Sequence, residues 1–134
     1  MAESVRGWLL VLSRLLIVFH PLALAVTASN ALSALPARGA AVALILILRL
    51  AVVGFGMAAG RALQTVQPGA VTLASAALLA SAATDVFVYV TPYFPNNRPP
   101  GDTPLYVAAT LAYHGGWLLY LRRSKRVQAT FSLP

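Results

Sequence analysis

The sequence of 134 residues contains no cysteine and has only three acidic residues, Glu3, Asp85 and Asp102. Without cysteine there is no disulfide framework, no thiolate nucleophile and no iron–sulfur or zinc–cysteine site. No two carboxylates are spaced for general acid–base chemistry. The sequence also lacks a nucleophile elbow, a phosphate-binding glycine loop and a His-x-x-x-His pair. We therefore expect a protein that is not an enzyme and that holds no metal ion.

Charge is scarce as well, since 10% of the residues are charged, 59% are hydrophobic and the mean hydropathy is +0.76. This composition is typical of an integral membrane protein, and the length suffices for one domain, residues 1–134. A net charge of +7 in a soluble protein would suggest a nucleic-acid partner. In a membrane protein, topology explains the excess better, and we expect no nucleic acid to bind.

The longest apolar stretch runs from Gly39 to Leu63, and Arg49 is the only charged residue in its first 22 positions. At a rise of ~1.5 Å per residue, 22 helical residues reach ~33 Å, about the thickness of the hydrocarbon layer of a bilayer. The stretch predicts a membrane span over residues 40–62. The guanidinium of Arg49 then requires a partner from a neighbouring span.

Hydropathy predicts three further spans, over residues 8–31, 70–91 and 104–121. Loop signals rich in proline and glycine separate the spans at residues 33–38, 64–69 and 91–103. His20-Pro21 predicts a kink in the first span. Arg14 interrupts what would be the apolar core of a signal peptide, so we expect no cleavage there. The expected fold class is all-α, a polytopic membrane protein with four transmembrane helices packed as a bundle.

Basic residues gather on one side of this arrangement, which predicts its orientation. That side collects Arg6, Arg14, Arg61, Arg122, Arg123, Lys125 and Arg126, and the other has only Arg38 and Arg98. The positive-inside rule therefore predicts that both termini are cytoplasmic. We expect the membrane to be the inner membrane of a bacterium. The cluster of Arg122, Arg123, Lys125 and Arg126 is expected to anchor the chain on anionic lipid headgroups.

Small residues at four-residue spacing allow membrane helices to approach closely. The second span has such a row at Gly56 and Gly60, and the third has one at Ala76, Ala80 and Thr84. These rows predict a close crossing of the second and third spans.

Each span contributes one polar residue to a layer at a shared depth: His20, Arg49, Asp85 and His114. Because charged groups cost at least ~2.5 kcal/mol each at that depth, we expect an ion pair between Arg49 and Asp85. The favoured interpretation is a structural pair that sets helix register. Two alternatives stay open: a proton or ion path, and ligation of a haem or (bacterio)chlorophyll by His20 or His114.

Three segments carry a resemblance: Gly7-Trp8-Leu9-Leu10, His20-Pro21-Leu22 and, above all, the stretch from Ser124 to Phe131. Together they resemble an uncharacterised bacterial family of small four-span inner-membrane proteins. In that family the last helix also ends in Ser-Lys-Arg-Val followed by Thr-Phe. The resemblance implies the same topology and location and assigns no activity.

These observations favour a non-catalytic accessory subunit that stabilises a larger membrane complex, for example a photosynthetic or respiratory one. Its expected partners are other membrane subunits and bound lipid, and no cofactor is required. A small ion-coupled or solute transporter that uses the layer around Asp85 is the first alternative. A haem- or pigment-binding anchor is the second.

Overall fold

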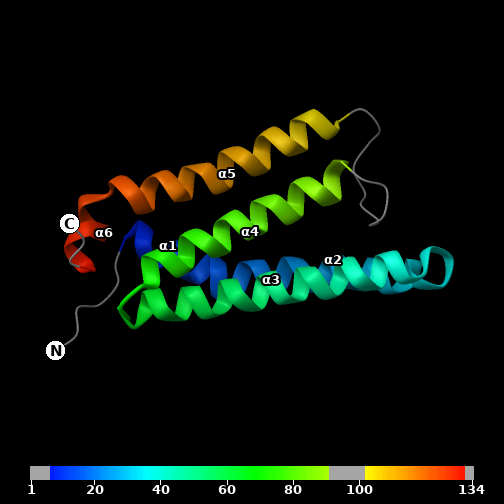
Figure 1. The fold of residues 1–134 in the computed structure, drawn as a ribbon, viewed down its shortest axis with the longest axis horizontal. Coiled ribbons are helices and arrows are strands. Elements are labelled where there is room, and N and C mark those ends of the chain that lie inside the picture. Colours follow the sequence, from blue (N-terminus) through cyan, green and yellow to red (C-terminus); the bar gives the residue numbers. More distant parts are fainter. Residues whose placement is uncertain (1–6, 91–101, 132–134) are drawn as a thin grey trace.

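The computed structural model describes residues 7–90 and 102–131, which form helices joined by turns, with no strand in these ranges (Figure 1). The helices are α1 Trp8–Arg14, η1 Leu15–Phe19, α2 His20–Arg38, α3 Ala40–Gln64, α4 Ala70–Val90, α5 Thr103–Arg123 and α6 Lys125–Thr130. The predicted loop over residues 91–103 lies outside the described residues except for Asp102 and Thr103.

Three helical segments are long and apolar enough to cross a membrane: Trp8–Ser29, Ala40–Gln64 and Ala70–Val90. They match three of the four predicted spans and indicate a membrane protein. The fourth predicted span is a helix, α5, but it is not among these segments. Its tyrosines, its histidine and its pair of glycines lower its hydropathy.

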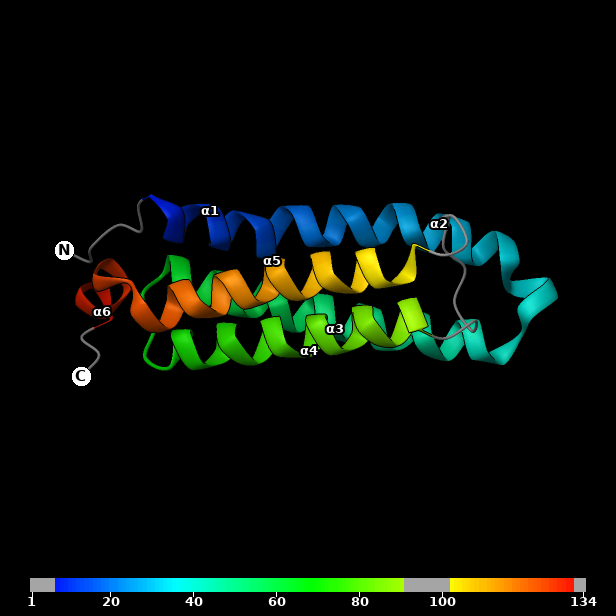
Figure 2. The ribbon, with the colours of Figure 1, turned by 90° about the horizontal axis from the view of Figure 1, so that it is seen from above.

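The central element of the bundle is α3, which packs against α1, η1, α2 and α4. Helix α5 packs on the outer side of α4, and α6 folds back on α5. The start of α1, the α3–α4 turn and α6 lie at one end of the bundle, and the α2–α3 turn lies at the other (Figure 2). Helix α5 meets the first helical stretch through long side chains, such as those of Trp8 and Trp117, whose ring centroids lie 6.5 Å apart.

The predicted irregularity at His20-Pro21 takes the form of a π-helical turn, η1, directly before it. The N–H of His20 bonds to the carbonyl of Leu15, five residues earlier. A proline cannot donate to the carbonyl four residues before it and clashes with that group, and the wider π turn relieves this clash. One extra residue in a turn also rotates every later side chain around the helix axis, which sets the direction of His20.

The predicted turn over residues 33–38 is wrong, because α2 continues through Pro36 and ends at Arg38. The chain reverses at Gly39, whose φ of 69° favours glycine. Strong helix formers around Pro36 outweigh the loss of one backbone hydrogen bond. Ser33 also returns its hydroxyl to the carbonyl of Ser29 at 3.1 Å.

The predicted crossing of the two small-residue rows is wrong in its pairing. A Cβ added at Gly60 would lie 3.0 Å from the carbonyl oxygen of Ser13 and 2.8 Å from Cγ1 of Ile17, so the glycines face α1 and η1. On α4, Ala76 is exposed. The buried stripe of α4 instead comprises Ala70, Ala74, Ala77, Leu78, Ser81, Thr84 and Val88. Apart from Leu78, these residues are alternately four and three positions apart, as in a coiled-coil seam. Only Thr84 belongs both to this stripe and to the predicted row.

Two apolar clusters close the ends of the bundle. The larger cluster joins buried residues of α1, η1, α3, α4 and α5 to Val127 of α6, and the smaller comprises Val42, Ile45 and Val88. The sequence did not predict α6. Ser124 caps this helix by accepting a hydrogen bond from the N–H of Val127 at 3.4 Å.

Candidate functional site

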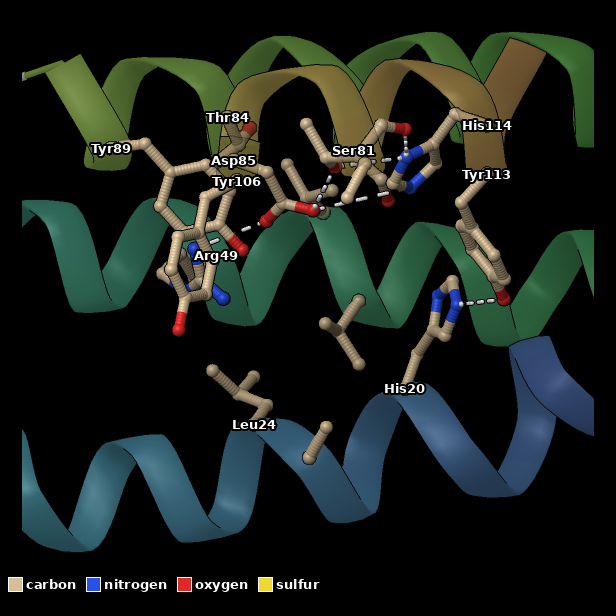
Figure 3. A pocket seen from close by; sticks show the side chains of 15 residues that line it. His20, Leu24, Arg49, Ser81, Thr84, Asp85, Tyr89, Tyr106, Tyr113 and His114 are labelled. Atoms are coloured by element: carbon tan, nitrogen blue, oxygen red, sulfur yellow. Dashed lines mark hydrogen bonds and ion pairs between the residues drawn. The ribbon is translucent and has the colours of Figure 1, made fainter. Parts of the chain in front are cut away.

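A cavity of about 330 Å³ lies between the two apolar clusters, among α2, α3, α4 and α5 (Figure 3). Its lining is His20, Ala23 and Leu24 from α2; Arg49, Val52 and Val53 from α3; Ser81, Thr84, Asp85 and Tyr89 from α4; and Tyr106, Ala109, Thr110, Tyr113 and His114 from α5. All four residues of the predicted polar layer are among them. The structure therefore brings together groups that lie up to 94 residues apart in the sequence.

The predicted ion pair is present. Nη1 of Arg49 donates to Oδ1 of Asp85 at 3.3 Å, and the two side chains are 19% and 25% exposed. Oδ2 of Asp85 accepts a second hydrogen bond, from the hydroxyl of Thr110 at 3.3 Å. Both carboxylate oxygens of Asp85 thus have a hydrogen-bond partner, which offsets the cost of burying a polar group in an apolar bundle.

His114 is held in a defined tautomer by the same network. Its Nδ1 lies 2.8 Å from the carbonyl oxygen of Thr110, which can only accept, so Nδ1 carries the proton. The hydroxyl of Thr110 uses its one proton on Asp85, so its oxygen, 3.2 Å from Nδ1, can only share the Nδ1 hydrogen with the carbonyl. Nε2 of His114 then lies 4.0 Å from Oδ2 of Asp85, with the ring only about 4% exposed.

His20 makes a different contact from the opposite wall. Its Nε2 lies 3.0 Å from the phenolic oxygen of Tyr113, and this bond crosses from α2 to α5 (Figure 3). The edge of the Tyr113 ring meets His114 with centroids 4.9 Å apart. The π turn before His20 and the length of the tyrosine side chain together make this bridge possible.

Sequence reasoning missed the tyrosines and Thr110. Tyr106, Thr110, Tyr113 and His114 follow helical spacing along α5 and all face the cavity. Tyr89 of α4 pairs with Tyr106 at a centroid distance of 5.7 Å. The sequence does contain a signal for them. These polar and aromatic residues lie at helical spacing from His114, so they could have been predicted to share its face of the helix.

The lining is electrically balanced, because its one guanidinium and its one carboxylate pair with each other. Apolar groups of α2 and α3 form the opposite wall. Across residues 7–90 and 102–131, no group of three or more His, Asp or Glu side chains is placed to hold a metal ion. The site can donate and accept hydrogen bonds to a small molecule and bury its apolar part.

The predicted basic anchor lies at the opposite end of α5 from Asp102. Arg122, Arg123 and Lys125 are exposed there, Arg126 lies in α6, and Arg61 is exposed at the same end of the bundle.

No protein-family model, curated protein or solved structure matches this chain.

Proposed function

We propose that this chain is a small membrane protein that binds a small molecule in the intramembrane cavity, as a solute-binding or transport protein does. The observation that supports this function is the volume beside the ion pair. If the two charges served only to set helix register, we would expect neighbouring side chains to pack tightly around them. An open cavity loses the van der Waals contacts that such packing provides. A cavity of about 330 Å³ falls in the size range of pockets that bind small molecules.

In this proposal α5 is the fourth span. Its 21 residues would extend ~32 Å, enough to cross the hydrocarbon layer. Two of its polar residues, Thr110 and His114, face Asp85 rather than the bundle exterior. The resemblance of the Ser124 to Phe131 segment to four-span proteins agrees with this arrangement.

The proposed orientation places the α6 end of the bundle in the cytoplasm of a bacterial inner membrane. The absence of native cysteine allows a direct test, because single cysteines need no background substitutions. In intact spheroplasts, a membrane-impermeant maleimide should label Ala40→Cys and leave Ala129→Cys unlabelled until the membrane is opened, since both positions are exposed. The reverse pattern would contradict the orientation.

Ligand binding is tested by filling the cavity from one of its small wall residues. Ala109 lines the cavity, and Ala108, its exposed neighbour on α5, does not. We expect native mass spectrometry of the protein in nanodiscs formed from its own membrane to show a retained small molecule in the wild type and in Ala108→Phe. Ala109→Phe should lose it. Equal retention by all three proteins, or retention by none, would contradict the proposal.

The accessory-subunit role is the second candidate, and one observation favours it. Helix α5 leaves Leu105, Leu111 and Leu119 exposed outside the cavity lining, and a helix of another subunit could pack on them. The same preparation distinguishes the two roles by particle mass and protein content. Stoichiometric partner subunits would support the accessory role, and a particle no larger than a dimer would count against it.

Ligation of a haem or pigment by His20 or His114 stays a prediction. Nδ1 of His114 donates to a backbone carbonyl, as it does in many ligating histidines, but its Nε2 is next to a carboxylate. A Soret band that disappears in His20→Ala or His114→Ala would establish it.

A further inference from the structure

A second cavity, shallow and more open than the first, adjoins it along α5. Its volume is also about 330 Å³, and its lining is Trp8, Tyr113, Gly116, Trp117 and Tyr120. Tyr113 lines both cavities, so its side chain forms their shared wall. Gly116 leaves the second cavity open, because a Cβ added there would meet nothing within 4 Å. The two cavities thus follow the seam between α5 and the helices α1 and α2.

The two cavities differ in chemistry. The first has hydrogen-bonding groups around a neutralised ion pair, and the second is walled by aromatic rings. A ligand that fills both needs a compact polar head and an elongated apolar body. Tyr113 and Gly116 are exposed along this seam, so the apolar body can reach the outer surface of the bundle there.

The charge balance argues for an uncharged head. Arg49 is already paired with Asp85, and no other Lys, Arg, Asp or Glu lines the cavity. An anionic head would meet the carboxylate of Asp85, and a cationic one would meet the guanidinium. In a region of low dielectric either charge would be costly to bury.

Hydrogen-bond donors lie at both ends of the first cavity, which favours a head with two acceptors. Tyr113 and neutral His20 share two polar hydrogens and use one in their mutual bond, so one is left to donate to a ligand. At the other end, Tyr106 also lines the cavity with its hydroxyl-bearing side chain. Tyr106 and Tyr113 lie seven residues apart on one face of α5, which separates their backbone positions by a rise of ~10.5 Å.

A six-membered ring with carbonyl groups on opposite sides matches this spacing. Its oxygens are about 5 Å apart, and a hydrogen bond of ~2.8 Å at each end extends the reach to about 11 Å. Such a ring can also lie against the tyrosine rings of the lining. We propose that the two cavities bind an isoprenoid quinone, with its ring between Tyr106 and Tyr113 and its tail along Gly116 and Trp117. This inference rests on the proposed function, since it names the ligand of the same cavity.

Intrinsic fluorescence provides the test, because Trp8 and Trp117 are the only tryptophans and both line the tail cavity. The probe is decylubiquinone, titrated into the protein in phosphatidylcholine nanodiscs. We expect saturable quenching in the wild type. Gly116→Leu should weaken binding at least tenfold by filling the tail cavity. Gly115→Leu is the matched control, since Gly115 is exposed on the same helix and lines neither cavity, and it should bind like the wild type.

Tyr106→Phe keeps the ring and removes the hydroxyl, so it should weaken binding about tenfold, the effect of one lost hydrogen bond. Quenching that rises linearly without saturation, or that is equal in wild type, Gly116→Leu and Tyr106→Phe, would overturn the proposal. Recovery of the fluorescence when decanoate is added at a lower concentration than decylubiquinone would also overturn it, in favour of an anionic amphiphile. If decylubiquinone fails while Ala109→Phe still loses a retained molecule, the proposed function stands and the quinone assignment is wrong.

Discussion

Replacing Asp85 with asparagine tests whether the ion pair supports the bundle. Asparagine keeps the shape of the side chain and removes its charge, which leaves the guanidinium of Arg49 uncompensated. At the observed 3.3 Å and an effective dielectric constant of about 20, the attraction that is lost amounts to about 5 kcal/mol. Breaking a buried pair costs about 3–5 kcal/mol in soluble proteins. Because both side chains here are about a fifth to a quarter exposed, we expect Asp85→Asn to lower the free energy of unfolding by about 2–3 kcal/mol.

The double variant Arg49→Met, Asp85→Asn distinguishes the effect of an unpaired buried charge from the effect of losing the ion pair itself. Removing both charges eliminates the buried charge that lacks a partner, so the double variant should lie within about 1 kcal/mol of the wild type. Unfolding by sodium dodecyl sulfate in mixed micelles, followed through Trp8 and Trp117, measures the wild type, the single variants Asp85→Asn and Arg49→Met, and the double variant. Asp102→Asn makes the same chemical change at the start of α5, outside the cavity lining, and should shift stability by less than about 0.5 kcal/mol.

Two results would refute this reasoning. If Asp85→Asn has the same free energy of unfolding as the wild type, Arg49 does not depend on Asp85 for its charge balance. If the costs of the two single substitutions simply add in the double variant, the two residues are not energetically coupled, and their 3.3 Å approach stabilises nothing.

Three further predictions concern packing and hydrogen bonds. Gly60→Ala should cost about 1–3 kcal/mol in the same assay, because its Cβ would meet the backbone oxygen of Ser13 at 3.0 Å, whereas Gly54→Ala has open space and should be neutral. Ser124→Ala should raise amide hydrogen exchange in α6 about fivefold through loss of about 1 kcal/mol of N-cap energy, and Ser124→Thr should retain protection. Thr110→Val removes the hydroxyl that contacts Asp85 and His114 and should cost about 1–3 kcal/mol, while Thr110→Ser should recover most of it; equal stability of the two Thr110 variants would show that the hydroxyl is not needed.

Much of the fold was predictable because the relevant signals are local. Apolar runs and their interruptions predicted the helices now seen as α3 and α4 to within two residues at each end. The polar layer was predictable for a similar reason. When antiparallel helices have known directions, counting residues gives each side chain a depth, and His20, Arg49, Asp85 and His114 do line one cavity.

The remaining features depend on how each helix is rotated about its axis, which small-residue spacing alone does not determine. Gly60 was correctly expected at a close crossing, yet its partner is the backbone of Ser13 rather than α4. Ala76 lies outside the buried stripe of α4 because a three-and-four alternation, not a strict four-residue row, stays on one face of a long helix.

The sequence by itself determined that this chain is helical and apolar and that it carries one polar residue on each of four helices, since composition and periodicity are properties of short segments. Only the tertiary structure decided that these residues surround an open cavity rather than a closed seam. That outcome depends on the π turn before His20, which directs its side chain toward Tyr113 across the gap between α2 and α5. Whether a side chain meets a partner 93 residues away follows from the rotation and separation of two helices, and no local pattern encodes either quantity.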